Sequence, residues 1–434
     1  MTVIAPALAA EGSLRQLSYR QRIRAILAGS AGNLIEWYDF YAYAFMALYF
    51  APSFFPEGDR TAQLLNAAGI FAAGFLIRPI GAWFFGRYAD RHGRRAAMIA
   101  SILMIGAGSL VIGLLPTYEA IGAWAPALLL VARLVQGFST GGQYGPAATY
   151  LSEAAIAGRR GFFASFQYVT IMAGQLSAIG MLFVLQQILS GEAIRDWAWR
   201  IPFFVGAALA ASVLLFRRAM HETVSEQARK PESGSLRGLV RHPLAILVVM
   251  SISSGGAIVL YTFTTYMQNF LVNTAGMNIE VVSVVMISAM VTFMVLQPVF
   301  GALSDWLGRR NCLLLFGGLM TFAAVPLLSA LETVSSPFQA FLLIVTALTI
   351  LSFYSSISGL FKSELFPVHI RALGVGLAHN VAAAVFGGSA AYVALFLKRA
   401  GHESWFYWYV AAVCFAAFIG AILINRLSRD RSLA

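Results

Sequence analysis

Charged and polar side chains stand inside stretches of the chain that are otherwise apolar. Between residues 24 and 50, Asn33, Glu36, Asp39 and Tyr43 recur at spacings of three, three and four, which place them along one helical face. A carboxyl group in such surroundings can bind and release a proton as its charged neighbours change. We therefore expect Asp39 to carry a proton, with Glu36 as the competing acceptor.

Two arginines, Arg78 and Arg133, lie in similar apolar stretches. Counting depth from the helix ends puts Asp39 and Arg133 at similar levels, so we expect an ion pair that protonation of Asp39 would release. Arg78 has no obvious acidic partner nearby in sequence, which makes an anionic substrate its candidate counter-charge. The alternative is a static network that only holds helices together, because buried ion pairs need not be functional.

Other polar residues in the apolar stretches could line a wet cavity. The alternative for each is a hydrogen bond between packed helices without substrate contact. Four of them, between residues 261 and 268, can share one helical face. The expected cavity residues, besides Arg78 and Tyr43, are Gln167, Tyr168, Gln175, Tyr261, Thr264, Thr265, Gln268, Ser352, Tyr354, Ser355, Ser358, Lys362 and Asn380.

The composition identifies the class of protein that must position these residues. Hydrophobic residues make up 59% of the 434 and charged residues 11%, which is too apolar for a soluble protein of this length. The apolar runs are long enough for membrane-spanning helices and too long for barrel strands. We predict an all-α polytopic membrane protein with spans near 24–50, 63–86, 96–115, 123–151, 160–188, 200–217, 244–271, 281–304, 311–331, 337–363, 372–397 and 404–425.

The distribution of positive charge predicts the orientation. With both termini placed inside, the inner segments hold 23 of the 30 Lys and Arg residues, so the net charge of +11 follows the positive-inside rule and does not indicate nucleic-acid binding. Arg20, Arg22 and Arg24 lead straight into a full-length span, so we expect no cleaved signal peptide. Cys312 and Cys414 fall within spans and suggest no disulfide framework.

The chain contains two copies of one architecture. The phrase Gly86-Arg-Tyr-Ala-Asp-Arg-His-Gly-Arg-Arg95 returns 215 residues later as Gly301-Ala-Leu-Ser-Asp-Trp-Leu-Gly-Arg-Arg310. We predict two six-helix halves, 1–217 and 244–434, joined by a polar cytoplasmic linker, 218–243. Repeats of this kind place the binding site between the halves, near the membrane midplane.

The repeated charges predict a cytoplasmic latch in each half. A Glu and an Arg seven residues apart also occur in both copies, as Glu153 with Arg160 and Glu364 with Arg371. We expect pairs that form in one conformation and separate in another. The alternative is a pair of tight turns whose arginines only fix the orientation. The expected pairing joins Asp90 and Arg94 with Glu153 and Arg160, and likewise Asp305 with Arg309 and Glu364 with Arg371.

These motifs resemble those of the major facilitator superfamily. The repeated phrase is similar to its cytoplasmic signature, and Arg133-Leu-Val-Gln-Gly137 resembles its fourth-helix motif. Asn33-Leu-Ile-Glu-Trp-Tyr-Asp-Phe40, Arg78-Pro-Ile-Gly81 and Trp199-Arg-Ile-Pro-Phe203 resemble the metabolite:proton symporter branch. Further similarity, nearly end to end, is to bacterial permeases for α-ketoglutarate.

The resemblance implies uptake of a dicarboxylate with protons through the bacterial inner membrane by alternating access, with α-ketoglutarate the expected substrate. Relatives for other organic acids or zwitterionic osmolytes share the general signatures and remain the alternative. The partners implied are the substrate, protons and the lipid bilayer, for a monomer without metal, cofactor or nucleic acid.

One position departs from the family pattern. After Gly141-Gly142 the family usually has Glu, whereas this chain has Gln143, which keeps the shape but cannot titrate. Gln143 either substitutes as a hydrogen-bonding residue or impairs proton coupling or the latch. A membrane-embedded enzyme is disfavoured, because no two of the six His residues show metal-ligand spacing and no nucleophile elbow or phosphate-binding loop occurs. A sensor that binds substrate without transporting it is a further alternative, which Gln143 keeps open. Such a sensor would be expected to carry long signalling extensions, whereas the tails of this sequence are short.

Overall fold

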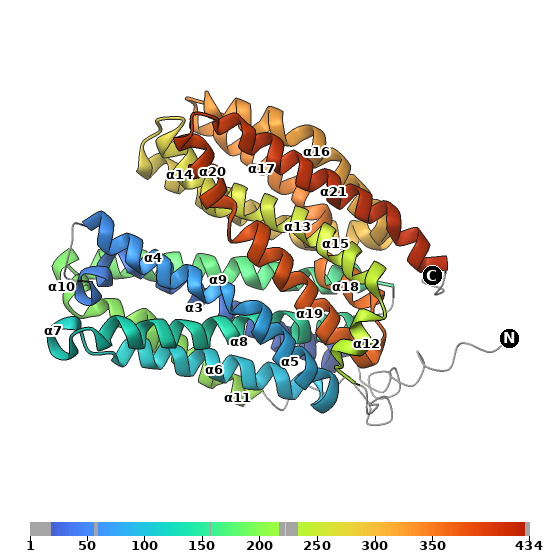
Figure 1. Cartoon of the computed structure of the whole chain (residues 1–434), viewed down its shortest axis with the longest axis horizontal. Coiled ribbons are helices and arrows are strands. Elements are labelled where there is room, and N and C mark those ends of the chain that lie inside the picture. Colours follow the sequence, from blue (N-terminus) through green and yellow to red (C-terminus); the bar gives the residue numbers. More distant parts are fainter. Residues whose placement is uncertain (1–18, 56–59, 157, 217–221, 223–232, 430–434) are drawn as a thin grey trace. The chain divides into compact units, whose positions relative to one another are not determined.

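The computed structural model describes residues 19–55, 60–156, 158–216, 222 and 233–429, which fold almost entirely into helices (Figure 1). Contacts within the chain divide it into two compact units. Unit 1 comprises Met1–Ala154, Thr170–Gly234 and Val368–Leu377, and unit 2 comprises Ala155–Val169, Ser235–Pro367 and Ala378–Ala434. Most of the predicted linker lies outside the described residues, so the division predicted from the sequence stays a prediction.

Unit 1 is built mainly from the first half of the sequence. Its packing is closest between α8 and the helices α5 and α6, and between α6 and α11. Its helices are α3 (Tyr19–Phe54), α4 (Arg60–Leu76), α5 (Arg78–His92), α6 (Arg94–Leu114), α7 (Tyr118–Ile121), α8 (Trp124–Ala154), the greater part of α9 (Arg160–Ile188), α10 (Gly191–Asp196), η1 (Ala198–Arg200), α11 (Ile201–Phe216), η5 (Val368–Ile370) and the start of α19 (Arg371–Ala382).

Unit 2 is built mainly from the second half. In it α21 packs along α13 and α16, and α15 packs along α17. Its helices, besides the start of α9 and the end of α19, are α12 (Leu236–Val240), α13 (Pro243–Tyr261), η4 (Thr262–Tyr266), α14 (Met267–Asn273), α15 (Ile279–Leu307), α16 (Arg309–Glu332), α17 (Pro337–Ser355), α18 (Ser358–Leu365), η6 (Ala383–Gly387), α20 (Ala390–Arg399) and α21 (Glu403–Arg429).

Nine helices in the described part of the chain are long and apolar enough to cross a membrane. They correspond to nine of the twelve predicted spans. The other three are α3, α8 and α11: α3 and α8 carry Glu36, Asp39 and Arg133 among other polar residues, and α11 is short. The polar residues that suggested chemistry thus also lower the hydropathy of their helices.

Four predicted spans are interrupted, where the sequence suggested single continuous helices. The span 63–86 breaks at Ile77, two residues before Pro79, which has no backbone N–H and clashes with the preceding turn. The spans 244–271 and 372–397 each contain a π-helical turn, η4 and η6, and 337–363 breaks between Ser355 and Ser358. Such breaks are typical of functional positions in helices.

Glycines allow α8 to pack backbone to backbone against α4 and α5. A Cβ added at Gly137 would lie 2.1 Å from the carbonyl oxygen of Gly74, and one at Gly141 would lie 2.0 Å from that of Arg78. Any side chain there would force the helices apart. This close approach brings Arg78 of α5 beside the polar segment of α8 that begins at Arg133.

Candidate functional site

Gln136 of α8 joins Asp39 of α3 to Arg133. Its Nε2 donates to Asp39 Oδ2 at 2.6 Å and to Ser109 Oγ of α6 at 3.0 Å, while its Oε1 accepts from Arg133 Nη1 at 2.8 Å. The predicted ion pair between Asp39 and Arg133 is therefore wrong as a direct contact. Gln136 lies one turn after Arg133 on α8, so its amide reaches into the space between the two charges.

Aromatic rings surround the two arginines of unit 1. The guanidinium carbon of Arg78 lies 4.0 Å from the ring centroid of Phe75 and 4.6 Å from that of Phe40. The same carbon of Arg133 lies 4.1 Å from the ring of Tyr43 and 5.6 Å from that of Phe40. Cation–π contacts of this kind stabilise positive charge away from water.

These buried charges retain unused hydrogen-bonding atoms. Nε and Nη2 of Arg78, Nε of Arg133 and Oδ1 of Asp39 have no partner among the described residues, although each side chain is buried. A buried polar atom without a partner costs roughly 1–3 kcal/mol, so a native example calls for an explanation. A bound anion would supply acceptors to the arginines.

Glu36 is buried on the same face of α3, near enough to Arg78 for their charges to interact. The sequence offered no acidic partner close to Arg78, because Glu36 is 42 positions away along the chain. Packing of α3 against α4 and α8 brings the two together. The carboxylate of Glu36 thus interacts electrostatically with Arg78, whose Nε and Nη2 still have no hydrogen-bond partner among the described residues.

Gln143 is fully buried and serves as a hydrogen-bond acceptor. Its Oε1 accepts from Ser101 Oγ of α6, while its Nε2 has no partner within the described part of the chain. Gly32 of α3 gives this amide room, since a Cβ there would lie 2.7 Å from Nε2. Gln143 therefore contacts α3 and α6 from α8, three turns away from Arg133.

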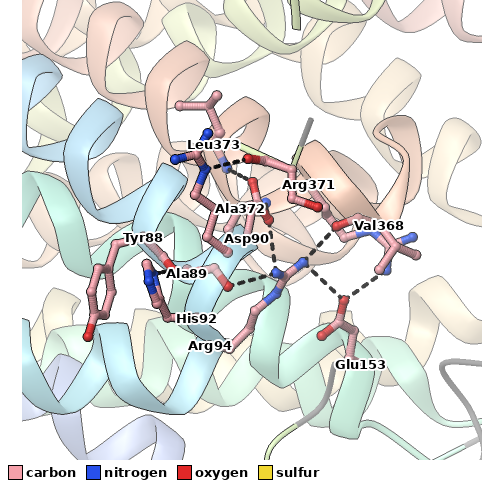
Figure 2. A network of polar contacts seen from close by, with 12 residues as sticks. Tyr88, Ala89, Asp90, His92, Arg94, Glu153, Val368, Arg371, Ala372 and Leu373 are labelled. Atoms are coloured by element: carbon pink, nitrogen blue, oxygen red, sulfur yellow. Dashed lines mark hydrogen bonds and ion pairs between the residues drawn. The ribbon is translucent and has the colours of Figure 1, made fainter. Parts of the chain in front are cut away.

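The Asp90 cluster comprises Asp90, Arg94, Glu153, Arg371 and the first turn of α19, all in unit 1 (Figure 2). Asp90 accepts backbone N–H bonds from Ala372 at 3.1 Å and Leu373 at 3.0 Å. Its carboxylate thus caps the start of α19, where a helix favours negative charge.

Basic residues complete the Asp90 cluster. Arg94 Nη1 lies 2.9 Å from Asp90 Oδ1, and Arg94 Nη2 lies 3.7 Å from Glu153 Oε1 and donates to the Val368 carbonyl at 3.0 Å. Arg371 Nη1 bonds the same Glu153 oxygen at 2.9 Å. Two arginines and two carboxylates therefore balance each other's charge.

The Asp305 cluster repeats this arrangement in unit 2. Asp305 accepts from the backbone N–H groups of Gly161 at 2.8 Å and Phe162 at 3.0 Å, so it caps the start of α9. Arg309 Nη2 lies 3.0 Å from Asp305 Oδ1. Arg160 Nη1 lies 3.2 Å from Glu364 Oε1.

The glycine of each repeated phrase forms the turn that places the Asp and Arg together. Gly93 and Gly308 have φ of 108° and 85°, values that side chains disfavour. Each ends one helix and begins the next, so Asp90 and Arg94, and likewise Asp305 and Arg309, meet across the turn. The turn and the ion pair, posed as alternatives from the sequence, are parts of one structure.

Of the expected pairing, the structure shows Arg94 beside Glu153, and it adds ion pairs inside the repeated phrases, between Asp90 and Arg94 and between Asp305 and Arg309. The second arginines pair with glutamates of the other copy, Arg160 with Glu364 and Arg371 with Glu153. The reason is that both arginines stand at the first position of helices whose starts bind the Asp of the other copy.

The remaining predicted residues occupy varied surroundings. Tyr43 donates its hydroxyl to the Ala67 carbonyl at 3.2 Å, and Ser355 donates to Gln297 Oε1 at 2.8 Å, so both connect helices. Thr265 lies in the π-helical turn and is exposed, whereas Tyr261 is buried, because that turn widens the helical spacing. Gln167, Tyr168, Gln175 and Asn380 are buried, and Gln268 is partly buried. Their predicted role in substrate binding stays a prediction.

Two functional candidates do not stand out in the sequence. Gln136 lies inside the fourth-helix motif, and Lys362 is one of many polar residues in the apolar stretches. Lys362 is fully buried and donates to Tyr354 at 3.1 Å and Ser358 at 2.8 Å, and it contacts His379 Nδ1 at 3.0 Å. The i, i+4 spacing of Ser358 and Lys362 was the available signal.

Comparison with known proteins gives the family. The model of the sugar (and other) transporter family matches residues 25–231 and 218–426. The chain belongs to this family. It is 53% identical over 425 residues to the α-ketoglutarate permease of Escherichia coli K12, covering 98% of each chain. It is 36% identical to a citrate-proton symporter of Klebsiella pneumoniae, covering 95% of this chain and 93% of that one.

A solved structure gives the fold. The proton:xylose symporter XylE, of the major facilitator superfamily, matches 94% of this chain and 96% of its own with a TM-score of 0.74 at 17% identity. The predicted all-α fold, with helices in two copies of one architecture, is like that of this solved transporter and is thus confirmed. The family of this chain and the nine helices of membrane-spanning length in its described part make it a multi-pass membrane transporter.

Proposed function

We propose that this transporter imports α-ketoglutarate together with protons, by alternating access. The observation that carries the proposal is the 53% identity, over 98% of both chains, to an α-ketoglutarate permease. The citrate-proton symporter among the relatives supports proton-coupled uptake of organic acids more generally. We infer a transport function and no covalent chemistry, since these relatives are transporters.

The arginines of unit 1 are the proposed anion-binding groups. Arginine binds carboxylates well because its N–H groups form a planar fork and its charge persists. The unused Nε and Nη2 of Arg78 and Nε of Arg133 support this role. The other proposed substrate contacts are those predicted from the sequence: Tyr43, Gln167, Tyr168, Gln175, Tyr261, Thr265, Gln268, Ser355 and Asn380.

Asp39 and Glu36 are the proposed proton acceptors, with Arg133 and Gln143 as the residues that modulate them. Protonation removes the charge of Asp39, which weakens the bond that it accepts from Gln136 and thereby frees Arg133 to reorient. The bridging position of Gln136 supports this link between proton and arginine.

The Asp90 and Asp305 clusters are the proposed cytoplasmic latches. The excess of Lys and Arg in the inner segments supports a cytoplasmic position for both clusters, and it supports cytoplasmic termini. Formation of both clusters would favour the conformation that is closed on that side, and their release would allow the other. The working unit is proposed to be a monomer in the lipid bilayer.

The direct test is uptake of labelled α-ketoglutarate by the purified protein in proteoliposomes with an inward proton gradient. We expect accumulation that collapses with the gradient and is competed by other dicarboxylates. Competition by betaine or proline instead would favour an osmolyte symporter. Absence of uptake for every dicarboxylate would overturn the proposed substrate class.

Arg78→Ala and Arg133→Ala should each lower the initial rate of uptake about 100-fold or more, because a buried charge interaction worth about 3 kcal/mol is lost. Arg195→Ala is the matched control, since Arg195 is exposed on α10, and should keep the rate. Asp39→Asn should abolish accumulation while exchange persists; unchanged accumulation would assign the proton to Glu36.

Gln143→Glu tests the one departure from the family pattern. If the chain transports poorly because Gln143 cannot titrate, the carboxylate should restore gradient-driven accumulation. If Gln143 acts as a hydrogen-bonding substitute, the variant should transport no better. Failure of both forms to take up α-ketoglutarate would count against the proposed function itself.

A further inference from the structure

Lys362 lies at the centre of a buried polar cluster in unit 2. Its Nζ contacts three uncharged acceptors: Tyr354 Oη at 3.1 Å, Ser358 Oγ at 2.8 Å and His379 Nδ1 at 3.0 Å. An ammonium group has three N–H donors, so these contacts satisfy the charged lysine completely. Lys362 is fully buried, whereas His379 is partly exposed.

The breaks in the helices create this cluster. The interruption between Ser355 and Ser358 redirects the chain so that Tyr354, from α17, and Ser358, from α18, both reach Lys362. Gly256 of α13 leaves space for the tyrosine, because a Cβ there would lie 2.0 Å from its ring. His379 comes from α19, just before the π-helical turn η6.

The hydrogen bonds of the cluster remain complete when one proton is removed. In the charged state Lys362 donates to His379 Nδ1, so the imidazole carries its proton on Nε2. In the neutral state the two remaining N–H groups of Nζ still donate to Tyr354 and Ser358. The Nζ lone pair then accepts from Nδ1–H of His379.

This exchange defines a balanced proton transfer. The proton moves from Lys362 Nζ to His379 Nδ1, and the imidazole releases its other proton from Nε2. The pair loses one proton in total and keeps the contact of 3.0 Å in both states. The buried lysine thus gains a route for its proton through the partly exposed histidine.

Three tyrosines of the described part of the chain also lie near the pair. Tyr354 comes from α17, Tyr168 of α9 lies within hydrogen-bonding reach of Ser358, and Tyr261 of α13 lies near Tyr168. Phenols are ordinarily neutral near pH 7. A change of one proton at the pair therefore changes the charge of the whole cluster.

We propose that Lys362 and His379 form a second proton-binding site, in unit 2, in addition to Asp39 and Glu36 of unit 1. This inference rests on the proposed proton-coupled uptake. The site binds one proton, takes it up and releases it at His379 Nε2, and changes the charge of α18 as it does so. Proton coupling then requires groups in both units.

The transport test compares Lys362→Met and His379→Asn with matched controls. Lys398→Met and His402→Asn are the controls, because those side chains lie outside the cluster. We expect each site variant to lose at least about tenfold in gradient-driven accumulation. Counterflow, which needs no net proton movement, should stay within about twofold, as for the controls.

Equal loss of accumulation and counterflow would overturn the proposal, since it would indicate substrate binding or structural damage. Unchanged accumulation would also overturn it. If the wild type does not accumulate any dicarboxylate, the proposed function fails, and a second measurement decides on the proton site alone.

That measurement is ¹⁵N NMR of labelled histidine in the full chain in nanodiscs. We expect Lys362→Met to change the titration midpoint of His379 by about one pH unit or more, because the shared proton is lost. His402 should keep its midpoint. An unchanged midpoint for His379 would show that the two groups do not share a proton.

Discussion

Gln136 connects two opposite charges that do not touch. In a direct ion pair, the charges of Asp39 and Arg133 would neutralise each other. The two side chains would then have little reason to separate. The amide instead uses its two donors on Asp39 and Ser109 and its acceptor on Arg133, so every atom of its head group is committed. A change in the charge of Asp39 can thus reach Arg133 through an amide that has no charge of its own.

Gln136→Leu should lower proton-driven uptake about tenfold or more, because it leaves buried Asp39 and Arg133 without this partner at a cost of roughly 1–3 kcal/mol each. The measurement is the initial rate of uptake in proteoliposomes. Gln186→Leu is the control, since Gln186 is exposed and bonds Tyr49. Normal uptake by Gln136→Leu would remove the bridge from the mechanism.

At the scale of elements, one carboxylate holds the start of one helix in each unit. Asp90 binds the first N–H groups of α19, and Asp305 binds those of α9. A charged acceptor makes such bonds stronger than neutral ones, and the helix dipole adds to them. The position of a whole helix end therefore depends on two carboxylate oxygens.

Asp90→Asn should loosen the start of α19, and Asp305→Asn the start of α9, since an amide offers one acceptor and no charge. Hydrogen–deuterium exchange should rise about tenfold in 371–380 for the first variant and in 160–166 for the second, as expected for bonds worth about 1.5 kcal/mol. Asp196→Asn, at the exposed end of α10, should change neither segment. Equal effects of Asp90→Asn and Asp305→Asn on both segments would contradict the assignment.

At the scale of the whole molecule, each unit takes one short segment from the other half of the sequence. Residues 368–377 belong to unit 1 and 155–169 to unit 2. Arg371 and Arg160 are carried in these segments, which is why each pairs with a glutamate from the other copy. Within each unit, an arginine of one copy of the repeat thus forms an ion pair with a glutamate of the other copy.

Double-mutant cycles should distinguish the two pairs. The side chains of Glu153 and Arg371 are 9% and 21% exposed, against 23% and 40% for Glu364 and Arg160. We expect a coupling free energy of about 1–2 kcal/mol for the first pair and below about 1 kcal/mol for the second, which water screens more. Thermal stability of Gln and Met variants in detergent measures both. The opposite order would contradict the role given to burial.

The sequence by itself determined the membrane class, the duplication and the residues of the two clusters. Hydropathy, helical period and the glycine turn are local properties, so the sequence indicates that Asp90 and Arg94 flank one turn. The face of α3 that carries Glu36 and Asp39 follows from the same rule, and both side chains are buried as that face requires.

Only the tertiary structure decided which helices supply the hydrogen-bonding partners of the buried charged residues. Spacing fixes the residues that share one helical face, but the register of one helix against another depends on close packing at positions such as Gly137 and Gly141. That register inserts Gln136 between Asp39 and Arg133. Likewise, the break before Ser358 brings Lys362 to His379, because a helix interruption redirects side chains in a way that an unbroken period cannot predict.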